Sequence, residues 1–279
     1  SYAGKAPVLA AARAGKRVVS VGDYGTVMIS DGGAFRQARE VPVNSTLTAV
    51  TFVDDKFGWA VGHWGAILHT EDGGETWTRQ RLDTTIDRPL FSVHFIDRNH
   101  GVAVGLWSLL LTTEDGGKSW NSVSLPKPPD GGRGDRNLFK VFGNRGDVLY
   151  VAAERGTVLR SADRGVTWTY LDTGYKGSLW TGLVLHDGSL VVAGLRGTAY
   201  RSVDDGKSWS QAMTHTKSSI TDLVESGNTL WGVGLDGVTL SSSDAGGSFV
   251  ARQRDDRLSL TAAVAAGDGS LLTFSKRGL

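Results

Sequence analysis

One eight-residue segment recurs along this chain and constrains its fold more than any other feature. A complete copy reads Thr70-Glu-Asp72-Gly-Gly74-Glu-Thr76-Trp77, and the shared pattern is Ser/Thr-x-Asp-x-Gly-x-Ser/Thr followed by an aromatic residue. The copies place their aspartates 40 to 48 residues apart, at Asp31, Asp72, Asp115, Asp163, Asp204 and Asp244. A period of this size indicates a solenoid, a propeller or an array of repeats.

The flanks of each copy favour a propeller. Around Asp72, residues 47–53, 58–62, 66–70 and 76–80 are short β-rich runs bounded by Gly or Asp, as strands joined by tight turns should be. Four short strands in each repeat of this length describe one propeller blade, here with strands a to d from the hub outward. No window shows sustained helical spacing, which argues against a helical solenoid.

We therefore expect one all-β domain over residues 1–279, a seven-bladed propeller of four-stranded antiparallel blades. The expected blades span residues 8–41, 47–82, 90–125, 138–171, 179–212, 220–252 and 258–279. The last range has room for strands a and b and only the start of c, so residues 1–7 are predicted to add an outer strand and join the two termini. The alternative is that the last blade lacks a C-terminal strand in this sequence. Six blades with an unclosed remnant is the least favoured arrangement.

The recurring segment resembles the Asp box, or bacterial neuraminidase repeat, of sialidases, sortilin-type receptors and many secreted propellers. The longer frame from Val50 to Trp77, with Gly58-Trp-Ala-Val-Gly62 at its centre, resembles the photosystem II stability/assembly factor family and its relatives in non-photosynthetic bacteria. The resemblance covers nearly the whole chain. It implies an extracytoplasmic propeller, in the periplasm or the thylakoid lumen, that docks a membrane complex under construction.

The Asp boxes are interpreted as structural. Each Asp can accept hydrogen bonds from backbone N–H groups of its own turn, and the glycine two residues later permits a positive φ. The aromatic residue that follows packs between blades, as expected for Trp77, Trp120, Trp168 and Trp209. The alternative is that these aspartates bind Ca²⁺ or act as acids.

The turns between strands b and c carry the differences between blades. Each is a Gly-x-x-Gly-like element, and its third position should project around one rim, opposite the Asp boxes. Aromatic residues fill this position in three consecutive blades, and arginines fill three of the other four: Tyr24, Trp64, Trp107, Arg155, Arg196, Asp236 and Arg277. Exposed aromatics beside arginines are typical of interface hot spots. Two interpretations stay open, a partner-binding ring and side chains that fold back over the blade tops.

One long connection should emerge on the same rim, near Trp107 and Arg155. Residues 124–137 are rich in Pro and Gly, and Lys127, Arg133 and Arg136 are its candidate binding residues. Loops of this length are often functional or mobile. Recognition by this loop and a merely tolerated insertion are both consistent with the sequence.

Catalysis is not favoured, and no catalytic residue is assigned. The Phe/Tyr-Arg-Ile-Pro signature of sialidases is absent. Glu154 could pair with Asp236 or Asp23 as the two carboxylates of a glycosidase, but no feature of the sequence favours either pair. The chain has no cysteine, so zinc–thiolate sites, disulfides and thiol nucleophiles are excluded, and its histidines show no metal-ligand spacing. We expect neither a metal nor another cofactor.

The remaining expectations concern partners. A net charge of +1 without charged blocks suggests no nucleic-acid partner, and no apolar run is long enough to span a bilayer. No signal peptide is present in this sequence. The resemblance to the assembly-factor family implies a non-catalytic, partner-docking assembly factor for a membrane protein complex or an envelope transporter. The alternative is a sialidase-like or other carbohydrate-processing or carbohydrate-binding propeller.

Overall fold

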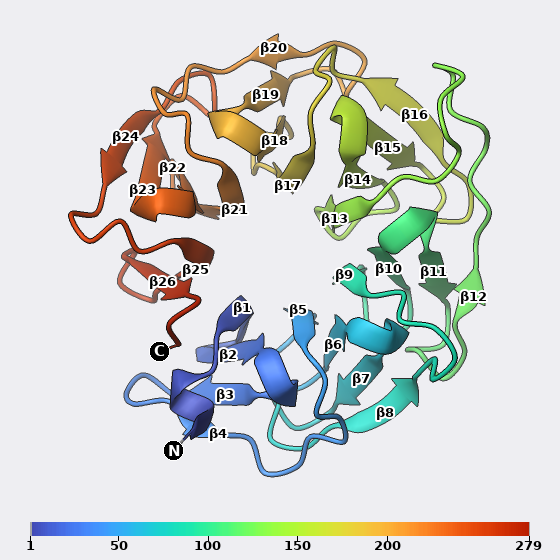
Figure 1. Ribbon diagram of the computed structural model, residues 1–279, viewed down its shortest axis with the longest axis vertical. Helices are drawn as coiled ribbons and strands as arrows, with labels where there is room; N and C mark the ends of the chain where they lie inside the picture. The colour runs from blue at the N-terminus through green and yellow to red at the C-terminus, as the bar shows by residue number, and fades with distance from the viewer. Residues whose placement is uncertain (1, 279) are drawn as a thin grey trace.

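The chain forms a ring of antiparallel sheets around a central axis (Figure 1). The computed structural model describes residues 2–278, and side chains from Gly4 onward, so that Ser1 and Leu279 of the expected 1–279 domain lie outside the described residues. Six sheets have four strands each, and the seventh has two. The expectation of seven four-stranded blades is therefore wrong, and the fold is a propeller of six four-stranded blades with an additional two-stranded sheet. After Ser275 the chain turns, and a bridge from Ser275 to Gly278 takes the place of a third strand.

The strands follow one another outward from the hub in every sheet, joined by hairpin turns. The first two blades contain β1 (Val8–Ala14), β2 (Arg17–Gly22), β3 (Val27–Ser30), β4 (Arg36–Gln37), β5 (Leu47–Phe52), β6 (Gly58–Gly62), β7 (Ile67–Thr70) and β8 (Thr78–Arg81). The next two contain β9 (Leu90–Phe95), β10 (Gly101–Gly105), β11 (Leu110–Thr113), β12 (Asn121–Ser122), β13 (Leu138–Gly143), β14 (Leu149–Ala153), β15 (Thr157–Ser161) and β16 (Thr169–Asp172). The others contain β17 (Leu179–Val184), β18 (Leu190–Gly194), β19 (Ala199–Ser202), β20 (Ser210–Gln211), β21 (Ile220–Ser226), β22 (Thr229–Gly234), β23 (Val238–Ser242), β24 (Val250–Gln253), β25 (Leu260–Ala265) and β26 (Leu271–Ser275).

The core lies between neighbouring blades rather than inside any one of them. Strand b is buried along its whole length in β6 and β10, because the preceding blade covers one face of each sheet and the following blade covers the other. This double burial explains why strand b reads as a continuous apolar run. Trp59 of β6 shows the packing, since its ring stacks on Phe95 of the following blade with centroids 3.4 Å apart.

The ring closes by packing of β25 against β1, not by exchange of a strand. Residues 2–5 form the 3₁₀ helix η1 (Tyr2–Lys5) instead of the predicted outer strand, because the segment packs against β3 of the first blade and does not pair with β26. The two ends are joined by a hydrogen bond of 2.7 Å from the hydroxyl of Thr261 to the carbonyl of Val8. An apolar cluster of Val8, Val18, Ala262, Val264 and Phe274 fills the seam.

Every strand a has a β-bulge at its second residue. In β5, for example, Leu47 pairs with Gly62 and Ala49 with Val61, so that Thr48 is left outside the ladder. The seven bulged residues are Leu9, Thr48, Phe91, Phe139, Trp180, Thr221 and Thr261. A bulge bends its strand and redirects the side chain of the extra residue.

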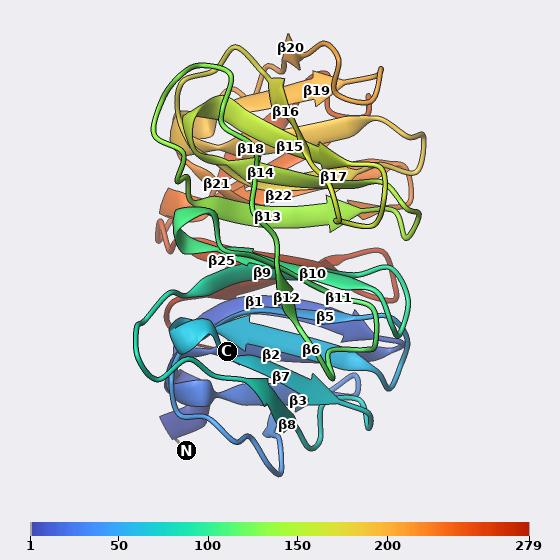
Figure 2. The ribbon, with the colours of Figure 1, turned by 90° about the vertical axis from the view of Figure 1, so that its right-hand side faces the viewer.

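Two rims result from this topology. The b–c turns form 3₁₀ helices that all lie on one side of the ring, at the left of Figure 2. The Asp boxes connect strands c and d at the other end of strand c, and so they occupy the opposite rim. Among residues 2–278 no helix is long and apolar enough to cross a membrane.

Candidate binding face

The five complete Asp boxes use their aspartates internally. In each, one carboxylate oxygen accepts the N–H of the Ser or Thr four residues later at 2.8 to 2.9 Å. The other oxygen accepts the hydroxyl of the same residue at 2.5 to 2.7 Å. Hydrogen bonds of this kind lower the pKa of Asp115, Asp204 and Asp244 to about 2. These carboxylates fasten their own turns.

The box tryptophans add a second fastening. The indole N–H of Trp77, Trp168 and Trp209 donates to the carbonyl of the glycine three residues earlier, at 2.8 to 2.9 Å. Trp120 differs, because its indole donates to Oε1 of Gln80 in the preceding blade at 3.1 Å.

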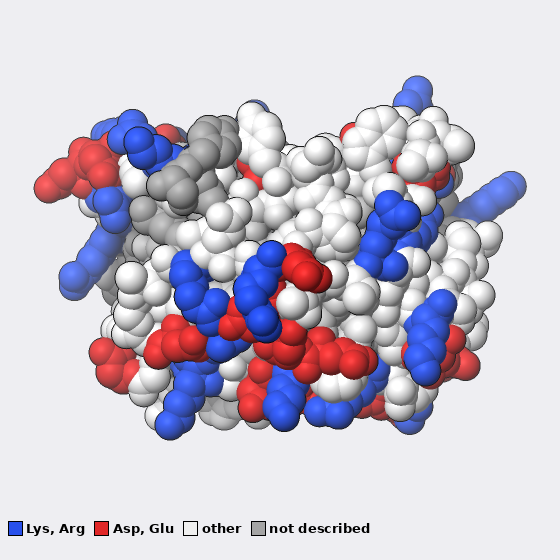
Figure 3. Space-filling model, turned by 90° about the horizontal axis from the view of Figure 1, so that it is seen from below, with Lys and Arg blue, Asp and Glu red and all other residues white. Residues whose placement is uncertain are grey.

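The first box does not form this arrangement. The aromatic residue Phe35 comes one residue early and so occupies the position of the last Ser or Thr of the box. The Asp31 carboxylate instead accepts two hydrogen bonds from Arg17, at 2.7 and 3.2 Å. Arg17 and Arg36 also pair with Glu75 of the second blade, and this network ties the two blades together. In Figure 3, which views the lower edge of the ring of Figure 1, basic and acidic side chains stand side by side, as expected for such paired charges.

The opposite rim carries the predicted ring of third-position residues, here called the turn ring. Six of them occupy 3₁₀ turns, η2 (Asp23–Gly25), η3 (His63–Gly65), η4 (Leu106–Ser108), η5 (Glu154–Gly156), η6 (Leu195–Gly197) and η7 (Leu235–Gly237). In all six the third-position residue has a positive φ of 51° to 59°, in the left-handed region that non-glycine residues rarely occupy. The seventh, Arg277, follows β26.

The turns are held by two sets of hydrogen bonds. The first residue of each turn donates its N–H to the carbonyl that precedes strand a of its own blade, as His63 does to Thr46 at 3.0 Å. In four turns the third-position residue, which is the second residue of the 3₁₀ turn, donates its N–H to a side chain of the connection to the next blade. The pairs are Trp64 with Asp87, Trp107 with Asn137, Arg196 with Ser219 and Asp236 with Ser259. These bonds stabilise the left-handed backbone and present the side chains from a rigid base.

All seven side chains of the turn ring are exposed. Tyr24 keeps 62% of its surface accessible, Trp107 50% and Trp64 40%, so none of the three rings is part of the blade core. Exposed large aromatics on consecutive blades are the composition of a recognition surface.

A groove of about 420 Å³ adjoins Trp64 on this rim. Pro42, Val43 and Leu82 give it an apolar floor, and Arg79 stands at its edge. The indole of Trp64 therefore forms one wall of a cleft between the first and second blades.

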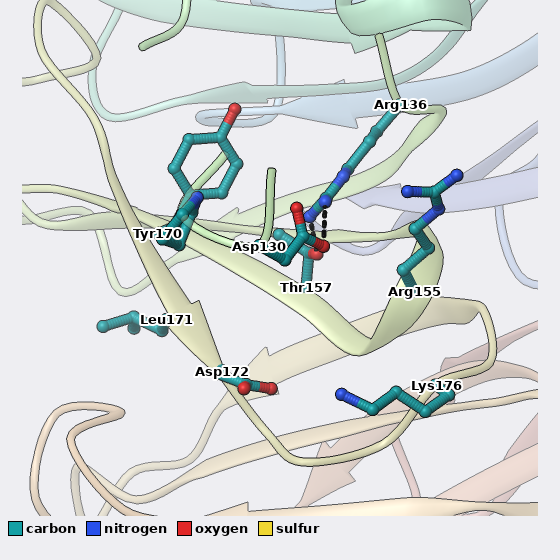
Figure 4. Close-up of a pocket in the computed structure, with 9 residues that line it drawn as sticks. Asp130, Arg136, Arg155, Thr157, Tyr170, Leu171, Asp172 and Lys176 are labelled. Carbon is teal, nitrogen blue, oxygen red and sulfur yellow. Dashed lines mark hydrogen bonds and ion pairs between the residues drawn. The ribbon is translucent and has the colours of Figure 1, made fainter. Parts of the chain in front are cut away.

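The long connection folds over the fourth blade on the same rim. Ser108 donates its N–H to the carbonyl of Arg136 at 2.6 Å, which places the connection beside the turn of Trp107. A pocket of about 90 Å³ lies beneath it, lined by Pro129, Asp130, Arg136, Arg155, Thr157, Tyr170, Leu171, Asp172 and Lys176 (Figure 4).

The three candidate residues of this connection lie in different environments. Lys127 and Arg133 are exposed, whereas Arg136 is 4% exposed. Its guanidinium bonds Thr157 and, at 2.5 Å, the carboxylate of Asp130, which Figure 4 shows converging. Arg136 thus locks the connection onto the blade and is not available to a partner. Arg155 and Lys176 supply the accessible positive charge of the pocket.

Sequence reasoning missed several residues of this face. Lys176 lies in an unremarkable connection, and nothing near it in sequence marks it as a neighbour of Arg155. The sequence could have indicated three other residues, because each is a polar residue directly before the first apolar residue of a strand a: Asn137, Ser219 and Ser259. No three His, Cys, Asp or Glu side chains between residues 2 and 278 are grouped in a way that could hold a metal ion.

Comparisons with known proteins agree with this architecture. The chain matches the family described as Photosynthesis system II assembly factor YCF48 over residues 30–170 and 80–228. A solved structure described as YCF48 bound to D1 peptide superposes with a TM-score of 0.76 at 18% identity, covering 99% of this chain and 92% of that one. YCF48 from Cyanidioschyzon merolae gives a TM-score of 0.73 at 16% identity, covering 99% and 94%. No curated protein sequence matches.

Proposed function

We propose, from the premise that this chain belongs to the YCF48 family of photosystem II assembly factors, that its turn ring docks an extended segment of a partner protein. The family consists of assembly factors and not of glycoside hydrolases, so the chain is a non-catalytic propeller. The observation that carries the proposal is the difference between the rims: the Asp boxes satisfy their own polar groups, whereas the turn ring exposes aromatic and cationic side chains on a fixed backbone.

The face offers two kinds of contact in neighbouring sectors. Trp64, with its groove, and Trp107 offer apolar surface in the second and third blades. Arg155, Lys176 and Arg196 offer positive charge in the fourth and fifth. We infer that the docked segment carries apolar side chains followed by an acidic group. Aromatic and Arg side chains contribute most to binding when they are desolvated by such a partner.

The finer assignment is that the partner is a membrane protein during its assembly. One similar structure, described as YCF48 bound to D1 peptide, motivates a peptide segment as the bound element. A place outside the cytoplasm, in the periplasm or thylakoid lumen, suits a factor that meets such a segment. Whether the partner is a photosynthetic complex or an envelope transporter is decided by the experiment below.

The experiment measures binding of fluorescein-labelled 15-residue peptides, drawn from the soluble segments of candidate membrane proteins of the source organism, by fluorescence anisotropy. The double variant Trp64→Ala/Arg196→Ala is expected to weaken the tightest peptide by about 30-fold or more, which corresponds to about 2 kcal/mol. Its melting temperature should stay within about 2 °C of the wild type, because both side chains are exposed.

The matched control is Lys118→Ala/Val203→Ser, which removes two exposed side chains of the Asp-box rim. It should leave the affinity unchanged. Equal losses in both double variants, or a melting temperature that falls by many degrees in the first, would refute the proposed role of the turn ring.

A further inference from the structure

The outer edge of β26 pairs with no third strand among residues 2–278. Its inner edge pairs with β25, and the bridge to Gly278 involves only Ser275, the last residue of the strand. Burial reflects this difference, because every residue of β6, β10, β14 and β18 is buried, whereas the first three residues of β26 are only partly buried. The stretch Leu271–Phe274 is therefore an open edge, and an open edge is a template for pairing with another strand.

A groove of about 230 Å³ adjoins this edge. Arg254 contributes to its lining, and the other side chains of the lining are mainly apolar: Phe35, Leu258, Leu260, Leu272 and Phe274. Phe35 belongs to the first blade and stands edge-on to Phe274, with ring centroids 6.0 Å apart. Because its walls come from β26, the first blade and the connection after β24, the groove lies in the place that strand c fills in the other six blades.

The open edge lies at the bottom of a recess. The sixth blade continues outward from its strand b with β23 and β24, and the first blade with β3 and β4, so both neighbours extend two strands farther from the axis than β26 (Figure 1). At about 4.8 Å per strand, the recess is about 10 Å deep. A second copy of the propeller cannot bring its own recessed β26 to this edge. A single extended segment is thin enough to enter.

The six complete blades show which side chains cover strand b at this place. Positions are counted here from the first residue after each 3₁₀ turn. The second and third positions are apolar or aromatic in every blade, with the exception of Thr239: Val27-Met28, Ile67-Leu68, Leu110-Leu111, Val158-Leu159, Ala199-Tyr200 and Thr239-Leu240. The fifth position always has a hydroxyl group: Ser30, Thr70, Thr113, Ser161, Ser202 and Ser242.

The two apolar positions serve opposite faces of the blade, as successive residues of a strand do. In the second blade, Ile67 packs in the cluster shared with the third blade and Leu68 in the cluster shared with the first. They pair with Val61 and Ala60 of strand b. In the seventh sheet the residues at these two places of strand b are Phe274 and Thr273.

Both faces of β26 offer apolar surface to an added strand. Leu272 and Phe274 pack with Val8 and Val18 of the first blade, and Leu271 packs with Val233 of the sixth. An added strand with two successive apolar residues therefore buries one side chain against each neighbouring blade.

We propose that the open edge of β26 binds an extended segment of a partner protein as a third, antiparallel strand, and that this segment has the pattern apolar–apolar–x–Ser/Thr. Main-chain hydrogen bonds supply affinity in strand addition of this kind, and the pockets for alternate side chains supply specificity. The edge lies between the sixth and first blades, so binding there does not depend on Trp64 and Arg196 of the turn ring.

A fluorescein-labelled peptide that copies residues 65–77 is the probe, because it carries the strand c and the Asp box of the second blade. It should bind the wild type in fluorescence anisotropy. The Leu68→Pro peptide, which loses a backbone donor, and the Ile67→Ser/Leu68→Ser peptide, which loses the apolar pair, should each bind at least about tenfold more weakly. No binding of the parent peptide at millimolar concentration, or equal binding of all three peptides, would overturn the proposal.

The variant Trp64→Ala/Arg196→Ala separates this site from the turn ring. It should bind the parent peptide like the wild type, even where it loses the partner peptides of the turn ring. An equal loss of both kinds of peptide would show that the probe binds the turn ring, and would contradict a site on β26.

The register of the added strand can be tested directly, because the chain has no cysteine and an introduced one is unique. Thr273→Cys should form a disulfide with the Leu68→Cys peptide at least about tenfold faster than with the Ile67→Cys or His69→Cys peptide, whose thiols point to the other face. Equal rates would contradict the pairing.

Hydrogen exchange on the wild type decides if the cysteine variant fails to fold. The outward-pointing amides of Leu271–Phe274 should exchange more slowly when the parent peptide is bound. Full protection of these amides without peptide would mean that the edge is covered within the molecule or by a second copy, and would overturn the proposal.

Discussion

The backbone N–H of Trp64 donates a hydrogen bond of 2.7 Å to Oδ1 of Asp87, across the boundary between the second and third blades. The other oxygen of Asp87 lies 2.9 Å from Nδ1 of His63. Burial alone would raise the pKa of Asp87, but the bonds from His63 and Trp64 outweigh it and lower the pKa. One carboxylate thus holds two consecutive residues of a turn whose third position is in the left-handed region.

We predict that Asp87→Ala loosens this turn without disturbing the blade. The left-handed conformation of Trp64 loses its acceptor, so partner binding should weaken several-fold while the free energy of unfolding falls by only about 1 kcal/mol. Peptide anisotropy and urea denaturation measure the two effects. Asp87→Asn keeps an acceptor for the Trp64 N–H and should bind close to the wild type; equal loss in both variants would contradict this role.

The Asp boxes should differ in their contribution to stability. Asp163→Ala removes a carboxylate that accepts two bonds from Thr167 and one from Ser161, and it should lower the free energy of unfolding by about 2–3 kcal/mol. Asp31→Ala removes ion pairs with Arg17 and Arg36 at the exposed surface and should cost less than Asp163→Ala. Urea denaturation of both variants checks this difference, and a larger loss for Asp31 would contradict it.

This contrast shows how far the sequence could predict the fold. The hydrogen bonds of a box lie within its eight residues, so one copy is enough to predict the strand–turn–strand geometry. The repetition of the box predicts the blades. The fate of Asp31 depends on Arg17, 14 residues away and in another strand, which no local pattern reveals. The same limit explains the errors over residues 1–7 and the last sheet, since ring closure depends on packing between the two ends of the chain.

The candidate site was predictable in position but not in detail. The third position of each b–c turn follows from the repeat alone, and the exposed rings of Trp64 and Trp107 lie there. The sequence does not predict that Arg133 is exposed and Arg136 is buried. Burial of Arg136 depends on Asp130 and Thr157, which contact it only in the folded structure.

Replacement of Arg136 should release the long connection. Arg136→Met removes the bonds to Asp130 and Thr157, so residues 124–137 should become accessible to trypsin, with faster cleavage after Arg133, which Gly134 follows. Limited proteolysis followed by mass spectrometry measures the cleavage rates. Arg196→Met, a change to an exposed arginine of the b–c turn η6, is the control and should leave them unchanged. Unaltered cleavage in Arg136→Met would show that other contacts hold the connection.

Acid should destabilise the protein through His94. Burial and the positive charges of Lys140 and Arg145 lower the pKa of His94 to about 4, below its ordinary value of 6.5. The unfolded chain therefore takes up a proton first as the pH falls, and the stabilisation present above pH 6.5 is lost between 6.5 and about 4, by about 3 kcal/mol in all. Urea denaturation at several pH values should show a shallower decline over this window in His94→Leu. Identical declines would contradict the assignment.

The central claim is that partners dock on the turn ring and not on the Asp-box rim, and hydroxyl-radical footprinting of the complex tests it most directly. Tyr24, Trp64 and Trp107 are exposed reporters of the turn ring, and Met213, 63% exposed, stands beside the box of the sixth blade through its bridge to Ser248. We predict that a bound partner peptide protects Trp64 and Trp107 from oxidation and leaves Met213 unprotected. Protection of Met213 with unchanged oxidation of both tryptophans would contradict the account.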